Sequence, residues 1–176
     1  SHAGEGHAAS NAGTVPDLLG KDVFRTAFAC LPAPYAGYKS VRVRLHLAST
    51  LGGIAFSRSG LGLCHAMSHS LGGMFHVAHG RLNAILLPAV IGSNAHVASK
   101  KYAELARAAG MGGSVDTIAV RNLKNGLIRL RLGLNLPETL VQAGVDPRSV
   151  WRNADEIVNA VLADPCCQSN PMAVAD

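Results

Sequence analysis

The sequence has few aromatic residues, few charged residues and no paired cysteine motif. Aromatic residues make up 5% of the 176 residues, with one Trp and three Tyr, so a surface for stacking nucleic-acid bases is not expected. The formal net charge of +5 comes from basic residues scattered along the chain rather than gathered into one patch. We therefore expect no nucleic-acid partner.

Long apolar runs and a signal peptide are missing as well. No run approaches the ~20 apolar residues that a bilayer requires, and the N-terminus lacks the basic-then-apolar order of a secretory signal. The four cysteines include the adjacent pair Cys166-Cys167 but no C-x-x-C motif, which favours reduced thiols over disulfides. These absences predict a soluble, cytoplasmic protein without a membrane partner.

Helical periodicity dominates what is present, and Gly and Pro punctuate it. The segment 40–56 is ambiguous, because its first apolar residues alternate as in a strand, but its later ones follow a helical face and we predict a helix. Pro88 is expected to kink the helix that contains it. The sequence predicts an all-α bundle of seven to eight helices, forming one domain over residues 1–176. The expected helices lie within 14–31, 40–56, 61–72, 80–96, 99–110, 120–134, 136–144 and 146–165.

Four histidines lie within the nineteen residues "GLCHAMSHSLGGMFHVAHG", at His65, His69, His76 and His79. Residues four apart share one face of a helix, so His65 and His69 point the same way. A second helix could return His79 to the same place, and facing imidazoles suit a divalent transition metal. The alternative is that each histidine is an ordinary core or surface residue. A zincin-type peptidase is excluded, because Ala66 stands where H-E-x-x-H requires Glu.

The stretch "GLGLCHAMSHSLGGMFHVAHGRLNAILLPAVIGSNA" resembles the signature of the iron-containing (group III) alcohol dehydrogenases. The likeness extends upstream through "LASTLGGIAFSRSGLG" and downstream through "YAELARAAGM" to "ADPCCQSNP", so it covers almost the whole chain. Within the family the sequence is most similar to the dehydrogenases of propanediol and ethanolamine breakdown. The resemblance implies the helical C-terminal half of such an enzyme, with the α-domain fold shared by dehydroquinate synthase. It leaves open a location in a bacterial microcompartment.

The resemblance also implies a metal centre. The family holds Fe(II), with Zn(II) as the alternative, through one Asp and three His; the histidines correspond here to His2, His65 and His79. The Asp is expected four residues before His2, which falls two positions before Ser1, and the N-terminal nucleotide-binding domain is expected to be missing with it. Glu5 or His7 could take the place of that carboxylate, although nothing in their spacing requires it.

Further residues take roles from the same resemblance. His69 matches the family histidine that approaches the nicotinamide and substrate, and it is a candidate for proton transfer; the alternative is a residue that only lines the cavity. Phe56 and Cys166 match positions that line the substrate pocket, whereas by residue type alone both are ordinary core residues. No residue of this chain is assigned to the cofactor NAD(P).

The implied reaction is NAD(P)-linked interconversion of a primary alcohol and an aldehyde, with this half inactive by itself. Its partners would be the alcohol or aldehyde substrate, the missing nucleotide-binding domain and a second copy of the chain. One alternative is a self-standing helical module that binds a transition metal without redox activity. Another is an assembly domain in which the histidines are structural. Metal analysis distinguishes these two alternatives.

Overall fold

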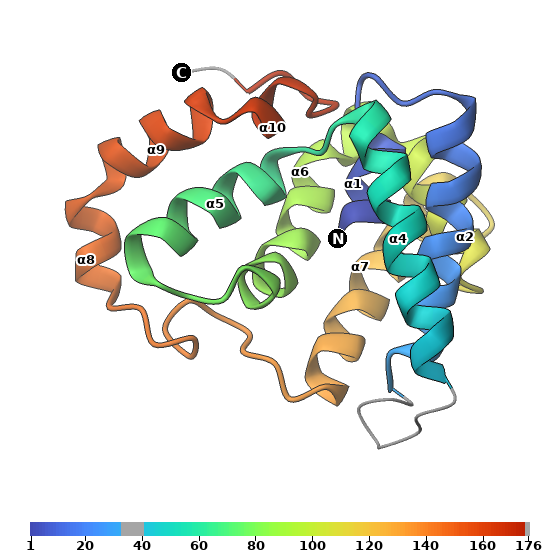
Figure 1. Ribbon diagram of the computed structural model, residues 1–176, viewed down its shortest axis with the longest axis horizontal. Coiled ribbons are helices and arrows are strands. Elements are labelled where there is room, and N and C mark those ends of the chain that lie inside the picture. The colour runs from blue at the N-terminus through green and yellow to red at the C-terminus, as the bar shows by residue number, and fades with distance from the viewer. Residues whose placement is uncertain (33–40, 175–176) are drawn as a thin grey trace.

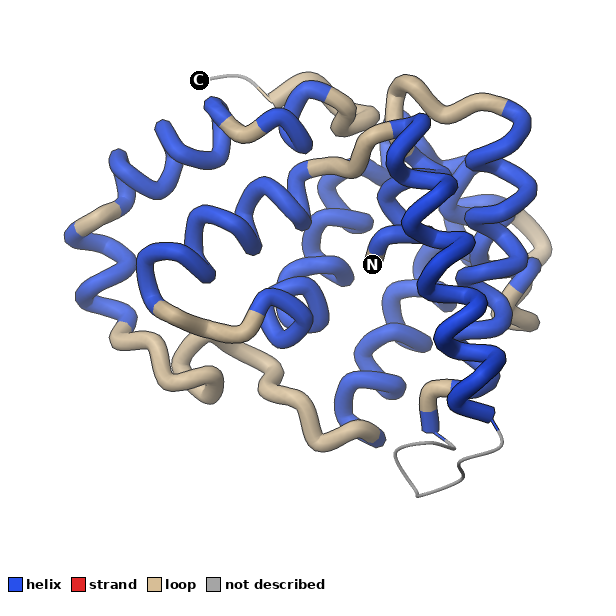
Figure 2. The backbone as a smooth tube through the Cα atoms, in the orientation of Figure 1, coloured by secondary structure: helices blue, strands red, loops and turns tan. Residues whose placement is uncertain are grey.

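The computed structural model describes residues 1–32 and 41–174, and within these ranges the chain is helical without a strand (Figure 2). The all-α prediction is confirmed. Nine helices occur among the described residues, against seven to eight expected. They are α1 (His2–Ala8), α2 (Thr14–Cys30), α4 (Arg42–Ser59), α5 (Leu63–Phe75), α6 (His79–Ala108), α7 (Asp116–Gly133), α8 (Pro147–Arg152), α9 (Ala154–Ala163) and α10 (Pro165–Gln168).

Helix α6 is the centre of the packing. It contacts α1, α2, α5 and α7, while α4 packs on α1 and α2. Helices α9 and α10 pack on α5, on the far side of the molecule from α2 and α4 (Figure 1). The short helix α1 therefore lies between the α2–α4 pair and α6, and it brings the N-terminus to the middle of the molecule.

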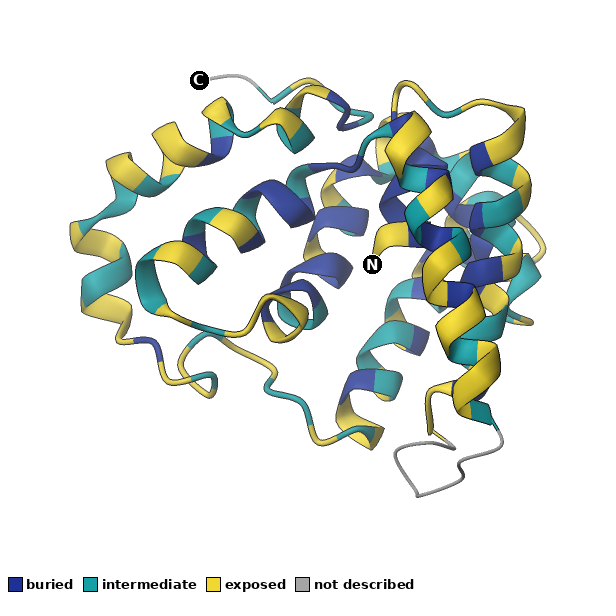
Figure 3. Cartoon of the chain, viewed as in Figure 1, coloured by how far each residue is buried: buried dark blue, intermediate teal, exposed yellow. Residues whose placement is uncertain are grey.

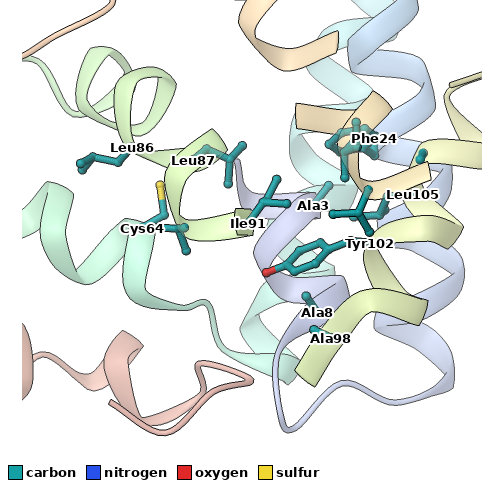
Figure 4. Close-up of a cluster of buried hydrophobic side chains, with 14 of the residues drawn as sticks. Ala3, Ala8, Phe24, Cys64, Leu86, Leu87, Ile91, Ala98, Tyr102 and Leu105 are labelled. Carbon is teal, nitrogen blue, oxygen red and sulfur yellow. The ribbon is translucent and has the colours of Figure 1, made fainter. Parts of the chain in front are cut away.

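The core follows α6. Its largest fully buried apolar side chains are Tyr102, Leu82, Ile91 and Leu105, and Leu123 reaches the same core from α7. Figure 4 shows this cluster, in which Ala3 and Ala8 of α1 lie beside Tyr102. Helix α6 has the length and hydropathy of a membrane span, but 50% of that window is buried inside the structure. The apolar composition of α6 is thus explained by its place in the core, where burial of each large side chain contributes about 1.5–3 kcal/mol.

Several expected helix ends differ from the observed ones. Helix α5 continues through Gly72-Gly73 and ends at His76, whose φ of 54° is left-handed. Pro88 lies inside α6, and the non-helical backbone of that helix is at Ala98 instead. The helices expected at 80–96 and 99–110 are joined as α6 and meet at a kink at Ala98, close to the predicted boundary, and the second of them ends before Gly110 in the left-handed conformation that glycine favours.

The C-terminal third differs most from expectation. The segment 136–144 forms turns rather than a helix, because the Gln142 side chain accepts from the Glu138 N–H and the Gln142 N–H donates to the Thr139 hydroxyl. Such local side-chain bonds compete with the helical ladder. The helix expected over 146–165 is divided at Asn153 into α8 and α9. These helices are mostly exposed (Figure 3).

Candidate metal centre

Three of the predicted site residues meet at one point. His2 is the first residue of α1, His65 lies in the first turn of α5, and His79 is the first residue of α6. Each offers one ring nitrogen, and the three nitrogens lie within 4.8 Å of one another. The ring centroids of His2 and His65 are 4.7 Å apart, and those of His65 and His79 are 5.2 Å apart. Three helices far apart in the sequence thus bring their imidazoles together.

Burial keeps the imidazoles of His2 and His79 in the form that binds metal. Partial burial of the His2 ring, reinforced by the neighbouring His65, lowers the pKa of His2 to about 4. Burial is also the main reason that the pKa of His79 is lowered, with His65 and His69 adding to it. Neutral imidazoles are ligands for divalent transition metals. The convergence of three imidazole nitrogens fits the donor set of Fe(II) or Zn(II).

Glu5 fixes the orientation of His65. Its carboxylate is hydrogen-bonded to His65 Nδ1 and accepts the Cys64 N–H at 2.8 Å, and both His65 and Glu5 are buried. A Cβ atom at Gly62 would come within 2.7 Å of the Glu5 carboxylate, so glycine leaves it the room it needs. With Nδ1 occupied, His65 presents Nε2 to the other rings. Glu5 therefore lies behind a predicted ligand, on the Nδ1 side of His65, and is not itself one of the converging donors.

Asn83 belongs to the site, although no role was predicted for it. Its side-chain nitrogen lies 3.0 Å from His79 Nε2 and 3.4 Å from His65 Nε2. The orientation of the amide follows from its other end, because Asn83 Oδ1 accepts from the Ser68 hydroxyl at 2.9 Å and from the Cys64 thiol. The signal was its position one helical turn after His79, in "HGRLNA".

The charge balance of the site also follows from its helices. Three helix N-termini converge there, and the positive end of a helix dipole opposes a cation. Glu5 supplies a carboxylate next to one of the three rings, but it already binds His65. An additional anionic ligand would therefore stabilise a divalent cation at this point.

His69 lies beside this group rather than within it. Its ring stacks on His79, with centroids 5.1 Å apart and planes at 15°. Its Nδ1 lies 2.8 Å from Asp164 Oδ2, a partner that the sequence analysis did not single out. Partial burial raises the pKa of Asp164, but hydrogen bonds from the Cys166 backbone and from His69 outweigh it, so the pKa is lowered overall. The carboxylate beside His69 is therefore ionised at neutral pH.

The two predicted pocket residues flank the histidines on opposite sides. Phe56 of α4 stacks on His2, with centroids 4.8 Å apart and planes at 19°. Cys166 of α10 has its ligand atom within 4.8 Å of those of His69 and Asp164. An open hollow of about 360 Å³ is lined by His69 and His79 together with Ser68, Gly72, Gly73 and Val77. Neither Phe56 nor Cys166 is among the residues that line this hollow, and their contact with substrate stays a prediction.

His7 lies apart from the metal-binding geometry. Its ring is fully buried, with Nδ1 3.3 Å from Asp17 and Nε2 3.3 Å from Glu104. Lys101 binds Asp17 at 2.5 Å, and Lys21 lies 3.7 Å from Glu104. His7 is thus the centre of a charged cluster between α1, α2 and α6, and it does not supply a ligand beside His2.

Comparisons with known proteins address the family of the chain. The family described as "Fe-containing alcohol dehydrogenase family, C-terminal" matches residues 1–176. The 1-propanol dehydrogenase of Citrobacter freundii is 37% identical over 100% of this chain and 49% of its own length. The NADPH-dependent butanol dehydrogenase of Clostridium saccharobutylicum is 33% identical over 97% of this chain and 44% of its own. This chain therefore spans less than half the length of these relatives.

Solved structures of the same family share the fold of this chain. The crystal structure of a 1,3-propanediol oxidoreductase superposes with a TM-score of 0.89 at 29% identity, covering 97% of this chain and 45% of that one. The iron-containing alcohol dehydrogenase of Thermococcus thioreducens gives 0.88 at 30% identity, covering 99% of this chain and 44% of that one. The chain belongs to the iron-containing alcohol dehydrogenase family and corresponds to its helical C-terminal part.

Proposed function

We propose that this chain is the metal-binding catalytic half of an NAD(P)-dependent dehydrogenase that interconverts short primary alcohols and aldehydes. The observation that carries the proposal is the convergence of His2, His65 and His79 from three helices, in a member of this family. Fe(II) is the expected metal and Zn(II) the alternative. The relatives named for 1-propanol and butanol support a short primary alcohol as substrate.

The three imidazoles and an upstream Asp would hold the metal, and the nucleotide-binding half would bring NAD(P) to it. A divalent cation bound there supplies Lewis acidity that polarises the alcohol oxygen. His65 is held in one tautomer by Glu5, so its Nε2 is available without reorientation. The neutral state of His2 and His79 means that no proton has to leave them near neutral pH.

His69 is proposed to carry the proton of the reaction. Asp164 faces Nδ1 at 2.8 Å, which makes Nδ1 the nitrogen that bears hydrogen and leaves Nε2 as the acceptor. An ionised Asp164 also stabilises the imidazolium that forms when Nε2 takes a proton from the alcohol. His69 is 45% exposed, so it can pass that proton on to solvent. Asp164 is thus a positioning residue for His69.

The test is reconstitution. The chain is joined to the sequence that precedes it in its gene, stripped of metal with a chelator, and reloaded with Fe(II) or Zn(II). We expect propanol-dependent reduction of NAD(P) to be lost on chelation and regained with metal, while residues 1–176 alone show metal binding without turnover. Stoichiometric metal binding without alcohol oxidation in the joined protein would instead favour the metal-binding module without redox activity.

A further inference from the structure

A second group of metal-ligating side chains lies next to the three-histidine centre. His69, Asp164 and Cys166 each offer one ligand atom, and these atoms lie within 4.8 Å of one another. The group shares no donor with His2, His65 and His79. It combines three ligand types, an imidazole nitrogen, a carboxylate oxygen and a thiol sulfur.

The protein holds this group in place from two sides. Asp164 caps the turn of α10, where its Oδ1 accepts the Cys166 N–H at 2.8 Å, while its Oδ2 contacts His69 Nδ1. The segment that follows is tied to α6, since the Asn170 and Asn94 side chains exchange two hydrogen bonds of 2.9 Å. Asn170 also accepts the Leu63 N–H at the start of α5. Two contacts therefore hold α5, which carries His69, against the turn that carries Asp164 and Cys166. One is the Asp164–His69 hydrogen bond, and the other is the bond from the Leu63 N–H to Asn170.

The chemistry of the donors selects the cation. Thiolate and imidazole together favour Zn²⁺ and similar thiophilic ions, whereas Mg²⁺ and Ca²⁺ require oxygen ligands. Burial, and then the hydrogen bond and charge of Asp164, raise the pKa of the Cys166 thiol to about 12. A cation that bonds weakly to sulfur cannot displace that proton. A thiophilic ion can, and the thiol proton then leaves to solvent as the metal–sulfur bond forms.

The charges also favour a cation here. The carboxylate of Asp164 and the thiolate of Cys166 together neutralise a divalent ion, so it need not repel a metal held by the neighbouring imidazoles. His69 is 45% exposed, which gives the ion access from solvent, and three protein ligands leave the fourth tetrahedral position to water. By comparison, the adjacent Cys167 belongs to no such cluster among the described residues.

We propose that His69, Asp164 and Cys166 form a second site, which binds Zn²⁺ or a similarly thiophilic divalent cation. Occupation of this site would remove His69 from the proton transfer proposed above. Zn²⁺ bound there would act as an inhibitor and not as the catalytic metal. The site itself needs only the three side chains, so it can be tested whether or not the chain oxidises alcohols.

The test uses Cd²⁺ as a spectroscopic probe for Zn²⁺, because a cadmium–thiolate bond gives an ultraviolet charge-transfer band. The protein as expressed from its own gene is titrated with Cd²⁺ after loading of the three-histidine centre with Fe(II). We expect the band to appear at one Cd²⁺ per chain, to disappear in Cys166→Ser, and to persist in the matched control Cys167→Ser. Asp164→Asn should weaken Cd²⁺ binding about tenfold or more, since a ligand is replaced by a neutral amide.

Every outcome of the Cd²⁺ titration either supports or overturns the assignment of the second site. A band that survives in Cys166→Ser, or that is lost in Cys167→Ser, would overturn the assignment. Absence of any thiolate band in the wild-type protein would do the same. His65→Ala gives a separate control, because it removes a donor of the first centre and should leave the band unchanged. Loss of the band in that variant, with its far-ultraviolet circular dichroism intact, would show that only one site exists.

Discussion

Helix α1 carries two histidines with opposite surroundings. His2 has its ring beside two other imidazoles and an aromatic ring, with no ion-pair partner of its own among the described residues. His7, five residues further on, is fully buried with a carboxylate 3.3 Å from each ring nitrogen. Lysines on α2 and α6 neutralise both carboxylates. At the start of α1, the His2 nitrogen thus lies near other imidazole nitrogens. At the end of α1, the His7 ring lies between the carboxylates of Asp17 and Glu104.

The difference between the surroundings of His2 and His7 indicates which histidines can bind a metal. A buried histidine surrounded by compensated carboxylates has little to offer a metal, because its nitrogens already face fixed charges. Histidines whose nitrogens converge present several lone pairs to one point, where a cation can replace the Asn83 amide as the partner of His65 and His79. Glu5 marks the boundary between the two regions, since it binds the far side of His65 and leaves the near side open.

The largest effect is expected for His65→Ala. Removing the central imidazole should reduce bound Fe(II) or Zn(II) from one per chain to near zero, and the thermal stabilisation by added metal should vanish with it. Metal analysis and melting curves with and without a chelator measure this. His96→Ala, exposed on α6, is the control and should keep its metal. Undiminished metal in His65→Ala would refute the ligand assignment.

His7→Ala should act on stability and leave metal binding unchanged. The change opens a cavity and leaves two carboxylate–lysine pairs facing it, which we expect to lower the free energy of unfolding by about 2–4 kcal/mol. Urea unfolding measures the loss, and His46→Ala on the exposed face of α4 should cost less than about 0.5 kcal/mol. Reduced metal content in folded His7→Ala would remove the distinction between the two regions.

Asp164→Asn tests the carboxylate that orients His69. Asparagine retains an oxygen that can cap α10, but it cannot stabilise a protonated imidazole. We expect kcat in the protein as expressed from its gene to fall about 100-fold, equivalent to about 2.7 kcal/mol, with the content of the three-histidine centre unchanged. Asp164→Glu should restore part of the rate. Equal loss of activity in both variants would leave Asp164 with a purely structural role.

Glu5→Gln is the smaller perturbation of the metal centre. The amide offers only one acceptor oxygen where Glu5 now accepts from both Cys64 N–H and His65 Nδ1–H, so one of these donors must face another donor. Metal affinity should fall about tenfold, equivalent to about 1.4 kcal/mol, as measured by competition with a chelator. An affinity equal to that of the wild type would mean that Glu5 does not set the orientation of His65.

The smallest effect concerns pH. Burial is the main reason that the pKa of His7 is lowered in the folded protein. The nearby carboxylates of Asp17 and Glu104 raise this pKa, and the nearby ammonium groups of Lys101 and Lys21 lower it. A lowered folded pKa means that the unfolded chain binds the proton first. Stability should therefore fall as pH drops below about 6.5 and continue falling toward the folded pKa. Chemical unfolding of metal-free protein between pH 7 and 5 should show a flatter dependence in His7→Ala than in wild type.

Much of the fold could be read from periodicity, because apolar spacing decides local structure wherever a helix has one buried face. Helices α2 and α7 follow such spacing, whereas the apolar Val43, Leu47 and Ile54 of α4 are exposed. The failures occurred where local hydrogen bonds or single residues decide the outcome. Gln142 and Thr139 hold 136–144 in turns, and His76 rather than Gly72-Gly73 ends α5. Neither outcome follows from hydrophobic pattern.

The helical class followed from apolar spacing in the sequence, whereas the family and the choice of His2, His65 and His79 followed from the resemblance of its motifs to that family. Only the tertiary structure decided which carboxylate faces which ring. Glu5 is 60 residues from His65, and Asp164 is 95 residues from His69, so no local pattern links them. Such pairs depend on how α1, α5 and α10 pack, and packing is settled by the whole core rather than by any one segment.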